Sequence, residues 1–165
     1  GEKLVEAVKF KGYKTQIDHK FKNTLKFGEK SQVLDGQDVK ELSAIFSDYK
    51  RTSFTYDAQK QTYLISQFKG PQIDGNTSEQ NSKQNIIFLD VNGQKIDNSK
   101  LLSLTTTGDG TGKYFSRGKS IDIKWSRSEG ANSFKFFTTD NQELIMMPGK
   151  IYVCVLPQWS SIDIK

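Results

Sequence analysis

The sequence has few of the residues that most often supply catalytic or metal-binding chemistry. It contains one cysteine, Cys154, and one histidine, His19, in 165 residues. A single cysteine cannot form an internal disulfide. A reactive thiolate needs a nearby base, and nothing in the sequence indicates that His19 lies near Cys154. No His, Cys and Asp residues have the spacing of a zinc site, and one histidine at the N-terminal edge supports no Ser-His-Asp site. We therefore expect no metal, no cofactor and no catalytic residues.

Long apolar runs are also absent. The longest are Ile86–Leu89, Leu144–Met147 and Ile151–Leu156, far below the roughly 20 residues that a membrane-spanning helix needs. Mean hydropathy is −0.62, but 12% of the residues are aromatic, unlike the aromatic-poor chains that stay disordered. The composition therefore predicts a folded domain with a polar surface and no membrane helix.

Arginine is scarce, with Arg51, Arg117 and Arg127 as the only three. The net charge is +5 and the pI is about 9.2, values that could suggest a nucleic-acid partner. Such proteins usually carry a basic stripe with stacking aromatics and arginine forks. Here the excess charge lies in residues 1–30, where eight Lys face four acidic residues. We interpret it as a lysine-rich, solubilising surface, and expect no nucleic-acid partner.

The N-terminal segment shows a helical pattern. Within residues 3–11, Leu4, Val5 and Val8 share one face, and lysines follow the early glutamates as the helix dipole prefers. We interpret residues 1–35 as this short helix and a connecting segment, the tail of a preceding domain. Residues 36–165 are then one β domain.

Strand signals dominate the rest of the chain. Short runs of Val, Ile, Thr, Phe and Tyr recur every 8–12 residues, separated by turn residues. The segment 39–47 fits either a helix or a strand, with the strand favoured, and Asn92-Gly93 and Gly108–Gly112 read as turns. The pattern predicts a mainly β fold of about eight to ten strands, a small antiparallel sandwich or barrel-like domain. The expected strands are Ser53–Asp57, Gln61–Phe68, Asn85–Val91, Leu101–Thr107, Lys113–Arg117, Ser120–Arg127, Phe134–Thr138, Glu143–Met147 and Lys150–Leu156.

The two tryptophans are predicted to differ in burial. Ile121, Ile123 and Trp125 alternate along one strand, so they share a face and should lie in the core. Trp159 follows Pro157 in a polar tail, and we expect it to be more exposed.

Residues 70–83 form a long polar segment with Ile73 as its one large apolar side chain. Long ordered loops often carry function. Asp74, Asn76 and Glu79 could converge on a partner or a cation, because Gly75 lets the chain fold back, but Asx turns that stabilise the connection explain the residues equally well. We take these three residues, with Arg117, as the candidate contact surface.

A glycine-rich phrase lies at residues 108–113. Gly108-Asp-Gly-Thr-Gly-Lys113 superficially resembles a phosphate-binding loop. Such a loop has four residues between its glycines and is followed by a helix, whereas here single residues separate the glycines and the pattern of a strand follows. The phrase therefore predicts no nucleotide site.

Several phrases of the sequence occur in a regular order: Ser53-Phe-Thr-Tyr-Asp57 with Tyr63, Gln72-Ile-Asp-Gly-Asn76, Glu79-Gln80, Asn85-Ile-Ile, Gly108-x-Gly-x-Gly-Lys-Tyr-Phe-x-Arg-Gly-Lys119, Trp125, Phe136–Asp140 and Met147-Pro-Gly-Lys-Ile-Tyr-Val153 to Pro157. Together they resemble the C-terminal domain of YerB-like lipoproteins of Gram-positive bacteria. Residues 1–35 look like the stretch that leaves the family's N-terminal domain. The family often has a histidine where this chain has Gln72, which argues against a catalytic histidine there.

The resemblance implies an extracytoplasmic protein that is attached to the cell membrane only through a lipid anchor outside this chain. The family's function is largely uncharacterised, so three classes stay open. The first is a non-catalytic accessory or binding domain that contacts an envelope protein or a cell-wall component. We favour this class, and we expect the domain to be a monomer. The second is a cell-wall-acting hydrolase, and the third is a structural domain that positions an N-terminal domain.

Overall fold

A computed structural model describes residues 2–13, 24–96, 101–131 and 133–165. One helix and fifteen strands lie within these residues. They are α1 (Glu2–Phe10), β1 (Lys26–Phe27), β2 (Gln37–Asp38), β3 (Glu41–Ile45), β4 (Arg51–Asp57), β5 (Thr62–Gln67), β6 (Gly70–Pro71), β7 (Ser82–Lys83), β8 (Asn85–Lys95), β9 (Leu102–Thr105), β10 (Gly108–Ser116), β11 (Lys119–Arg127), β12 (Lys135–Thr138), β13 (Ile145–Met146), β14 (Ile151–Pro157) and β15 (Ser161–Ile164).

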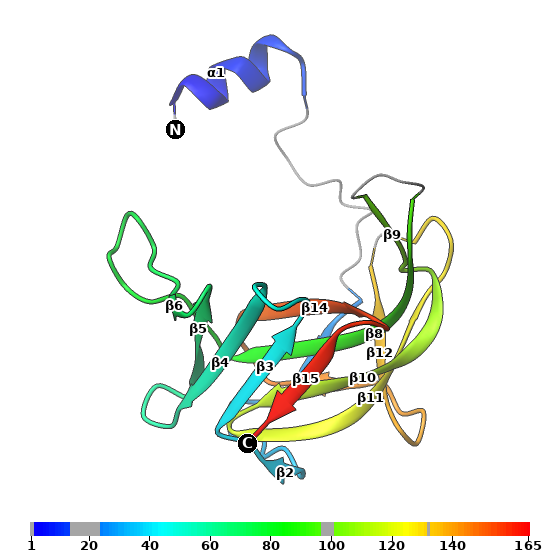
Figure 1. Ribbon diagram of the computed structural model, residues 1–165. Helices are drawn as coiled ribbons and strands as arrows, with labels where there is room; N and C mark the ends of the chain where they lie inside the picture. Colours follow the sequence, from blue (N-terminus) through cyan, green and yellow to red (C-terminus); the bar gives the residue numbers. More distant parts are fainter. Residues whose placement is uncertain (1, 14–23, 97–100, 132) are drawn as a thin grey trace.

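The strands form two main sheets that pack face to face (Figure 1). One sheet has the order β15-β3-β4-β5-β6, with β7 also paired to β5. The other has the order β12-β11-β10-β8-β14, with β2 paired to β11 and β9 to β8. The mainly β, sandwich-like fold is therefore confirmed, and the sheets are not closed into a barrel. The ambiguous segment 39–47 contains strand β3, as favoured.

Strand β8 lies at the centre of the fold. Its residues Ile86, Ile87, Phe88 and Leu89 are each no more than 1% exposed, because both of its faces are covered. Ile86 and Phe88 point into the cluster between the two sheets, whereas Ile87 and Leu89 belong to a second cluster on the opposite face. A strand that is buried on both sides reads as a continuous apolar run, which is the pattern in the sequence. Its neighbour β14 runs parallel to it.

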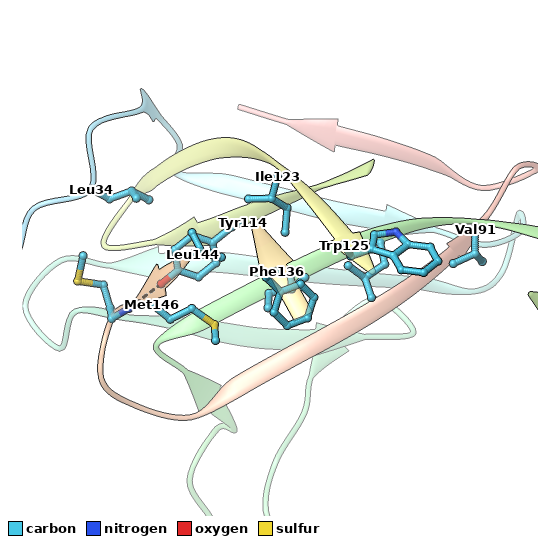
Figure 2. Close-up of a cluster of buried hydrophobic side chains, with 11 residues drawn as sticks. Leu34, Val91, Tyr114, Ile123, Trp125, Phe136, Leu144 and Met146 are labelled. Atoms are coloured by element: carbon cyan, nitrogen blue, oxygen red, sulfur yellow. Dashed lines mark hydrogen bonds between the residues drawn. The ribbon is translucent and has the colours of Figure 1, made fainter. Parts of the chain in front are cut away.

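The second cluster holds the predicted tryptophan. Trp125 is 3% exposed and Ile123 is 1% exposed, so their burial is confirmed. Figure 2 shows Trp125 with Phe136 of the neighbouring strand β12 and, in the same cluster, Leu34, Leu144 and Met146. Trp159 is 43% exposed, as expected, but the tail that carries it continues into β15, which pairs with β3.

Two predicted turns are wrong. Asn92 and Gly93 continue β8 and pair with β9, and Gly108–Gly112 is the first half of β10. In both places the glycine lets a tryptophan ring lie close to the backbone of a strand, and no turn forms. A Cβ atom on Gly110 would lie 2.7 Å from the indole of Trp125, and one on Gly93 would lie 2.7 Å from the ring of Trp159.

The N-terminal helix is confirmed as α1, and its Leu4 and Phe10 are exposed, at 72% and 92%. No helix in the described residues is long and apolar enough to cross a membrane. Farther along, Leu34 packs in the core and β1 pairs with β13.

Candidate functional site

The predicted contact loop is held by its own hydrogen bonds. The Asp74 carboxylate accepts bonds from the backbone N–H groups of Asn76 and Thr77, each at 3.0 Å, and from the Thr77 hydroxyl at 3.3 Å. These bonds hold the pKa of the Asp74 carboxyl below its usual value. The backbone N–H of Asp74 also donates to the Glu79 carbonyl at 2.8 Å. The tip is therefore an exposed Asx turn that brings Asp74, Asn76 and Glu79 together.

Arg117 lies at a different turn, between β10 and β11. Residues Ser116 and Lys119 pair across it, and Arg117 and Gly118 both have positive φ, at 51° and 71°. Positive φ at both central positions is the type I′ geometry of a two-residue hairpin, which costs a non-glycine residue strain. Among the described residues, no hydrogen bond or ion pair joins Arg117 to Asp74, Asn76 or Glu79.

The side chain of Arg117 borders a surface hollow of about 600 Å³. Four of its lining residues are cationic and none is acidic. We call it the basic hollow, and its lining residues are Lys30, Lys60, Gln61, Gln84, Ser116, Arg117, Met147, Pro148, Gly149 and Lys150. The cations come from four separate segments: the connection before β2, the β4–β5 turn, the β10–β11 turn and the start of β14.

Buried polar groups position one side of the basic hollow. The hydroxyl of Tyr114 donates to Asn85 Oδ1 at 2.6 Å and accepts from the backbone N–H of Met147 at 2.8 Å. Asn85 Nδ2 in turn donates to the Met147 carbonyl at 3.0 Å. Beside them, the Gln84 side chain accepts from the backbone N–H of Lys150 at 2.8 Å. The Met147–Lys150 turn is therefore fixed at both of its ends.

A second buried tyrosine fixes the Arg117 turn. The Tyr63 hydroxyl accepts the backbone N–H of Gly118 at 3.1 Å. Burial raises the pKa of Tyr63 and of Tyr114 above the usual value of 10.0, so both phenols stay protonated further into the alkaline range than an exposed tyrosine does. The Arg117 guanidinium donates to the carbonyls of Gln32, at 2.8 Å, and Lys30, which draws Lys30 to the rim.

The charges of the basic hollow are not neutralised by partners. Within the part of the chain that the structure describes, Lys30, Lys60, Arg117 and Lys150 form no salt bridge. The acidic residue nearest to Lys60 in the chain, Asp57, accepts two backbone N–H groups of its own turn, at 3.0 and 3.1 Å. Four cations without a salt-bridge partner in the described residues therefore surround one hollow.

Metal-ligating clusters and an exposed thiol are not found among the described residues. No group of three or more His, Cys, Asp or Glu is placed there to hold a metal ion. Cys154 is buried in the core between the sheets, where burial raises the pKa of its thiol to about 12. His19 lies outside the described residues.

Sequence reasoning named Arg117 but missed the three lysines. They are scattered over 120 positions, from Lys30 to Lys150, and nothing in their spacing joins them. A signal was nevertheless present. The phrases Asn85-Ile-Ile, Lys113-Tyr-Phe-x-Arg-Gly118 and Met147-Pro-Gly-Lys150, which carry the family resemblance, supply Arg117, Lys150 and the buried groups beside them, but neither Lys30 nor Lys60.

Residues 42–153, more than half of the chain, match the family described as "Protein of unknown function (DUF3048) C-terminal domain". The chain belongs to this family. The resemblance to a YerB-like C-terminal domain is thereby confirmed, and with it a domain whose function is unknown. No match was found among curated proteins.

A solved structure shows the same fold. The crystal structure of the YerB protein from Bacillus subtilis superposes with a TM-score of 0.77 at 20% sequence identity. The match covers 98% of this chain and 53% of the YerB chain. The chain therefore spans about half the length of that relative, and the identity supports a shared fold alone.

Proposed function

We propose that this member of the DUF3048 C-terminal family is a non-catalytic binding domain of a cell-envelope lipoprotein. It contacts an acidic envelope protein or an anionic cell-wall component through the basic hollow. The observation that carries the proposal is the set of four cationic side chains around one hollow that has no acidic lining residue.

The construction of the basic hollow supports binding. Its rim is attached to the core by Asn85, Tyr114 and Tyr63, which are each fully buried. A rigid rim brings the charges together before the ligand arrives, so association costs less conformational entropy. Lysine heads on flexible stems attract an anion as point charges, while Arg117, whose guanidinium is held by the carbonyls of Lys30 and Gln32, adds a fixed positive charge.

The cellular location in the proposal follows from the family resemblance, and its other parts follow from the residues of the sequence. The domain is extracytoplasmic and attached to the membrane only through a lipid anchor outside this chain, and it acts as a monomer with no nucleic-acid partner, metal or cofactor. The exposed loop with Asp74, Asn76 and Glu79 is a second contact surface, distinct from the basic hollow.

A sedimentation assay with purified cell walls tests the proposal. The double variant Lys60→Glu, Lys150→Glu reverses two charges at the basic hollow and should reduce co-sedimentation about tenfold or more. The control variant Lys69→Glu, Lys135→Glu changes the net charge equally at exposed lysines outside the hollow.

The control should sediment like the unchanged domain. Equal loss in both variants would mean that net charge, not the basic hollow, governs binding. Release of soluble wall fragments by the unchanged domain would instead establish the hydrolase alternative. If walls are not bound, the same two variants are compared for cross-linking to an acidic envelope protein in membranes.

A further inference from the structure

A second depression lies beside the N-terminal half of strand β15. Its volume is about 800 Å³, and its lining shares no residue with the basic hollow. Residues of β15, of the start of β10 and of the middle of β8 form its walls. We call it the edge groove, and its lining residues include Asp90, Gly108, Asp109, Thr111, Ser161 and Ile162.

Strand β15 is the end strand of its sheet (Figure 1) and pairs with β3 on one side. Just beyond the strand, the Lys165 N–H donates to the Glu41 carbonyl at 2.8 Å, and the Glu41 N–H donates to the Lys165 carbonyl at 3.0 Å. Bonded and non-bonded pairs alternate along antiparallel strands, so the backbone groups of Ile162 and Ile164 point away from β3. Within the part of the chain that the structure describes, these backbone groups have no hydrogen-bond partner. The outer edge of β15 is therefore open.

A second open strand edge borders the edge groove. Strand β10 pairs with β11 from Gly108 to Ser116, but its pairing with β8 begins at Gly112. From Asn92 onward, β8 pairs with β9 instead. The side of Gly108–Thr111 that faces away from β11 therefore has no strand partner among the described residues. An exposed strand edge is a template for pairing with another chain.

The charged side chains that line the edge groove are acidic. Asp90 and Asp109 are both exposed there, and neither lysine nor arginine is a lining residue. The Thr111 hydroxyl donates to Asp90 Oδ2 at 2.9 Å, but neither carboxylate forms a salt bridge within the described ranges of the chain. A cationic side chain that enters the groove therefore meets two carboxylates and no competing cation.

We propose that the edge groove binds an extended peptide segment of a partner protein that contains lysine or arginine and adds as a strand to the outer edge of β15. In strand addition, main-chain hydrogen bonds give affinity and alternate side chains give specificity. Ile162 and Ile164 supply the outward N–H and C=O groups, and Asp90 and Asp109 attract the basic side chains. The inference does not depend on the basic hollow, which is lined by cations.

Fluorescence anisotropy tests the assignment with a labelled peptide that alternates threonine and lysine over about eight residues, within the usual length of a strand. The peptide is titrated with the 165-residue chain at low ionic strength. We expect saturable binding, and slower hydrogen exchange at the backbone amides of Ile162 and Ile164 in the complex.

Two matched peptides separate strand addition from charge attraction. The first has the same sequence with a methyl group on every backbone nitrogen, so it cannot donate main-chain hydrogen bonds. The second has glutamate in place of lysine. Each should bind about tenfold more weakly or less.

Variants of the chain decide the location of binding. Asp109→Lys reverses a charge in the edge groove and should weaken binding about tenfold, whereas Asp140→Lys, at an exposed turn outside the groove, should bind normally. Ile162→Pro removes an outward N–H but no hydrogen bond to β3, so it should fold and bind more weakly. The proposal is overturned if the peptide does not bind, if either control peptide binds equally well, or if Asp109→Lys binds like Asp140→Lys.

Discussion

The phenol of Tyr114 donates a 2.6 Å hydrogen bond to the side-chain oxygen of Asn85, and the two residues are buried on neighbouring strands β10 and β8. Asn85 would be costly in a core without partners. Here its carboxamide and the Tyr114 hydroxyl pair with each other and with both backbone groups of Met147. The pair therefore connects the core to the turn that forms one side of the basic hollow.

Removing the Tyr114 hydroxyl should destabilise the domain. Tyr114→Phe leaves Asn85 Oδ1 without its donor and the Met147 N–H without its acceptor, both in the interior. The free energy of unfolding should fall by about 1–3 kcal/mol in urea titrations. Tyr49→Phe, at a residue that is 81% exposed, is the control and should change it little. Equal stability of the two variants would contradict the role of the buried pair.

The two tryptophans should differ sharply in their contribution to stability. Trp125→Ala removes a side chain that is 3% exposed and packs against Phe134 with ring centroids 5.5 Å apart. The loss of buried surface and the resulting cavity should cost about 3–5 kcal/mol. Trp159→Ala should cost clearly less, because that residue is 43% exposed. Chemical denaturation followed by circular dichroism measures both losses of stability. An unchanged midpoint for Trp125→Ala would show that Trp125 does not lie in the core.

The buried thiol should make stability fall at alkaline pH. Burial raises the pKa of Cys154 from 9.0 to about 12, so the thiol ionises in the unfolded chain at a lower pH than in the native state. Its contribution is fully present below pH 9 and is lost as pH rises toward 12. The free energy of unfolding, measured by urea titration at increasing pH, should decline across this window. Cys154→Ala should show a shallower decline, and identical slopes would contradict the burial of the thiol.

Substitutions in the contact loop should leave the fold intact. Asp74→Ala, Asn76→Ala and Glu79→Ala together remove side chains that lie in no strand and are not buried. The thermal midpoint should change little, while cross-linking to an envelope partner should weaken. If the triple variant unfolds and no binding change is found, the Asx turn is structural only.

Much of the fold was predictable because alternation and turn chemistry are local. The hairpin of β4 and β5, the buried strand β8 and the inward face of Trp125 all follow from short patterns. The two turn predictions failed for one reason. Gly93 and Gly110 look like turn residues in the sequence, but they are glycines because a tryptophan ring packs against each of them. Only the tertiary structure shows that contact.

The candidate site was less predictable. Arg117 was named only as a neighbour of the predicted contact loop, and Lys30, Lys60 and Lys150 look like ordinary lysines in the sequence until the sheets bring their turns together. The sequence also grouped Arg117 with the Asp74–Glu79 loop. In the described residues these lie at separate turns with no hydrogen bond or ion pair between them. Pairing of strands far apart in sequence, which local patterns do not encode, decides which loops meet.

The most direct test of the central claim is calorimetric titration of the 165-residue chain with two soluble polyanions, inorganic polyphosphate and polyglutamate, at increasing salt. The account predicts saturable binding of at least one polymer that weakens as salt rises. It also predicts at least a tenfold loss, about 1.4 kcal/mol, in Lys60→Glu, Lys150→Glu, with little loss in Lys69→Glu, Lys135→Glu. Failure to bind either polymer at low salt, or equal loss in the two variants, would contradict an anion-binding role for the basic hollow.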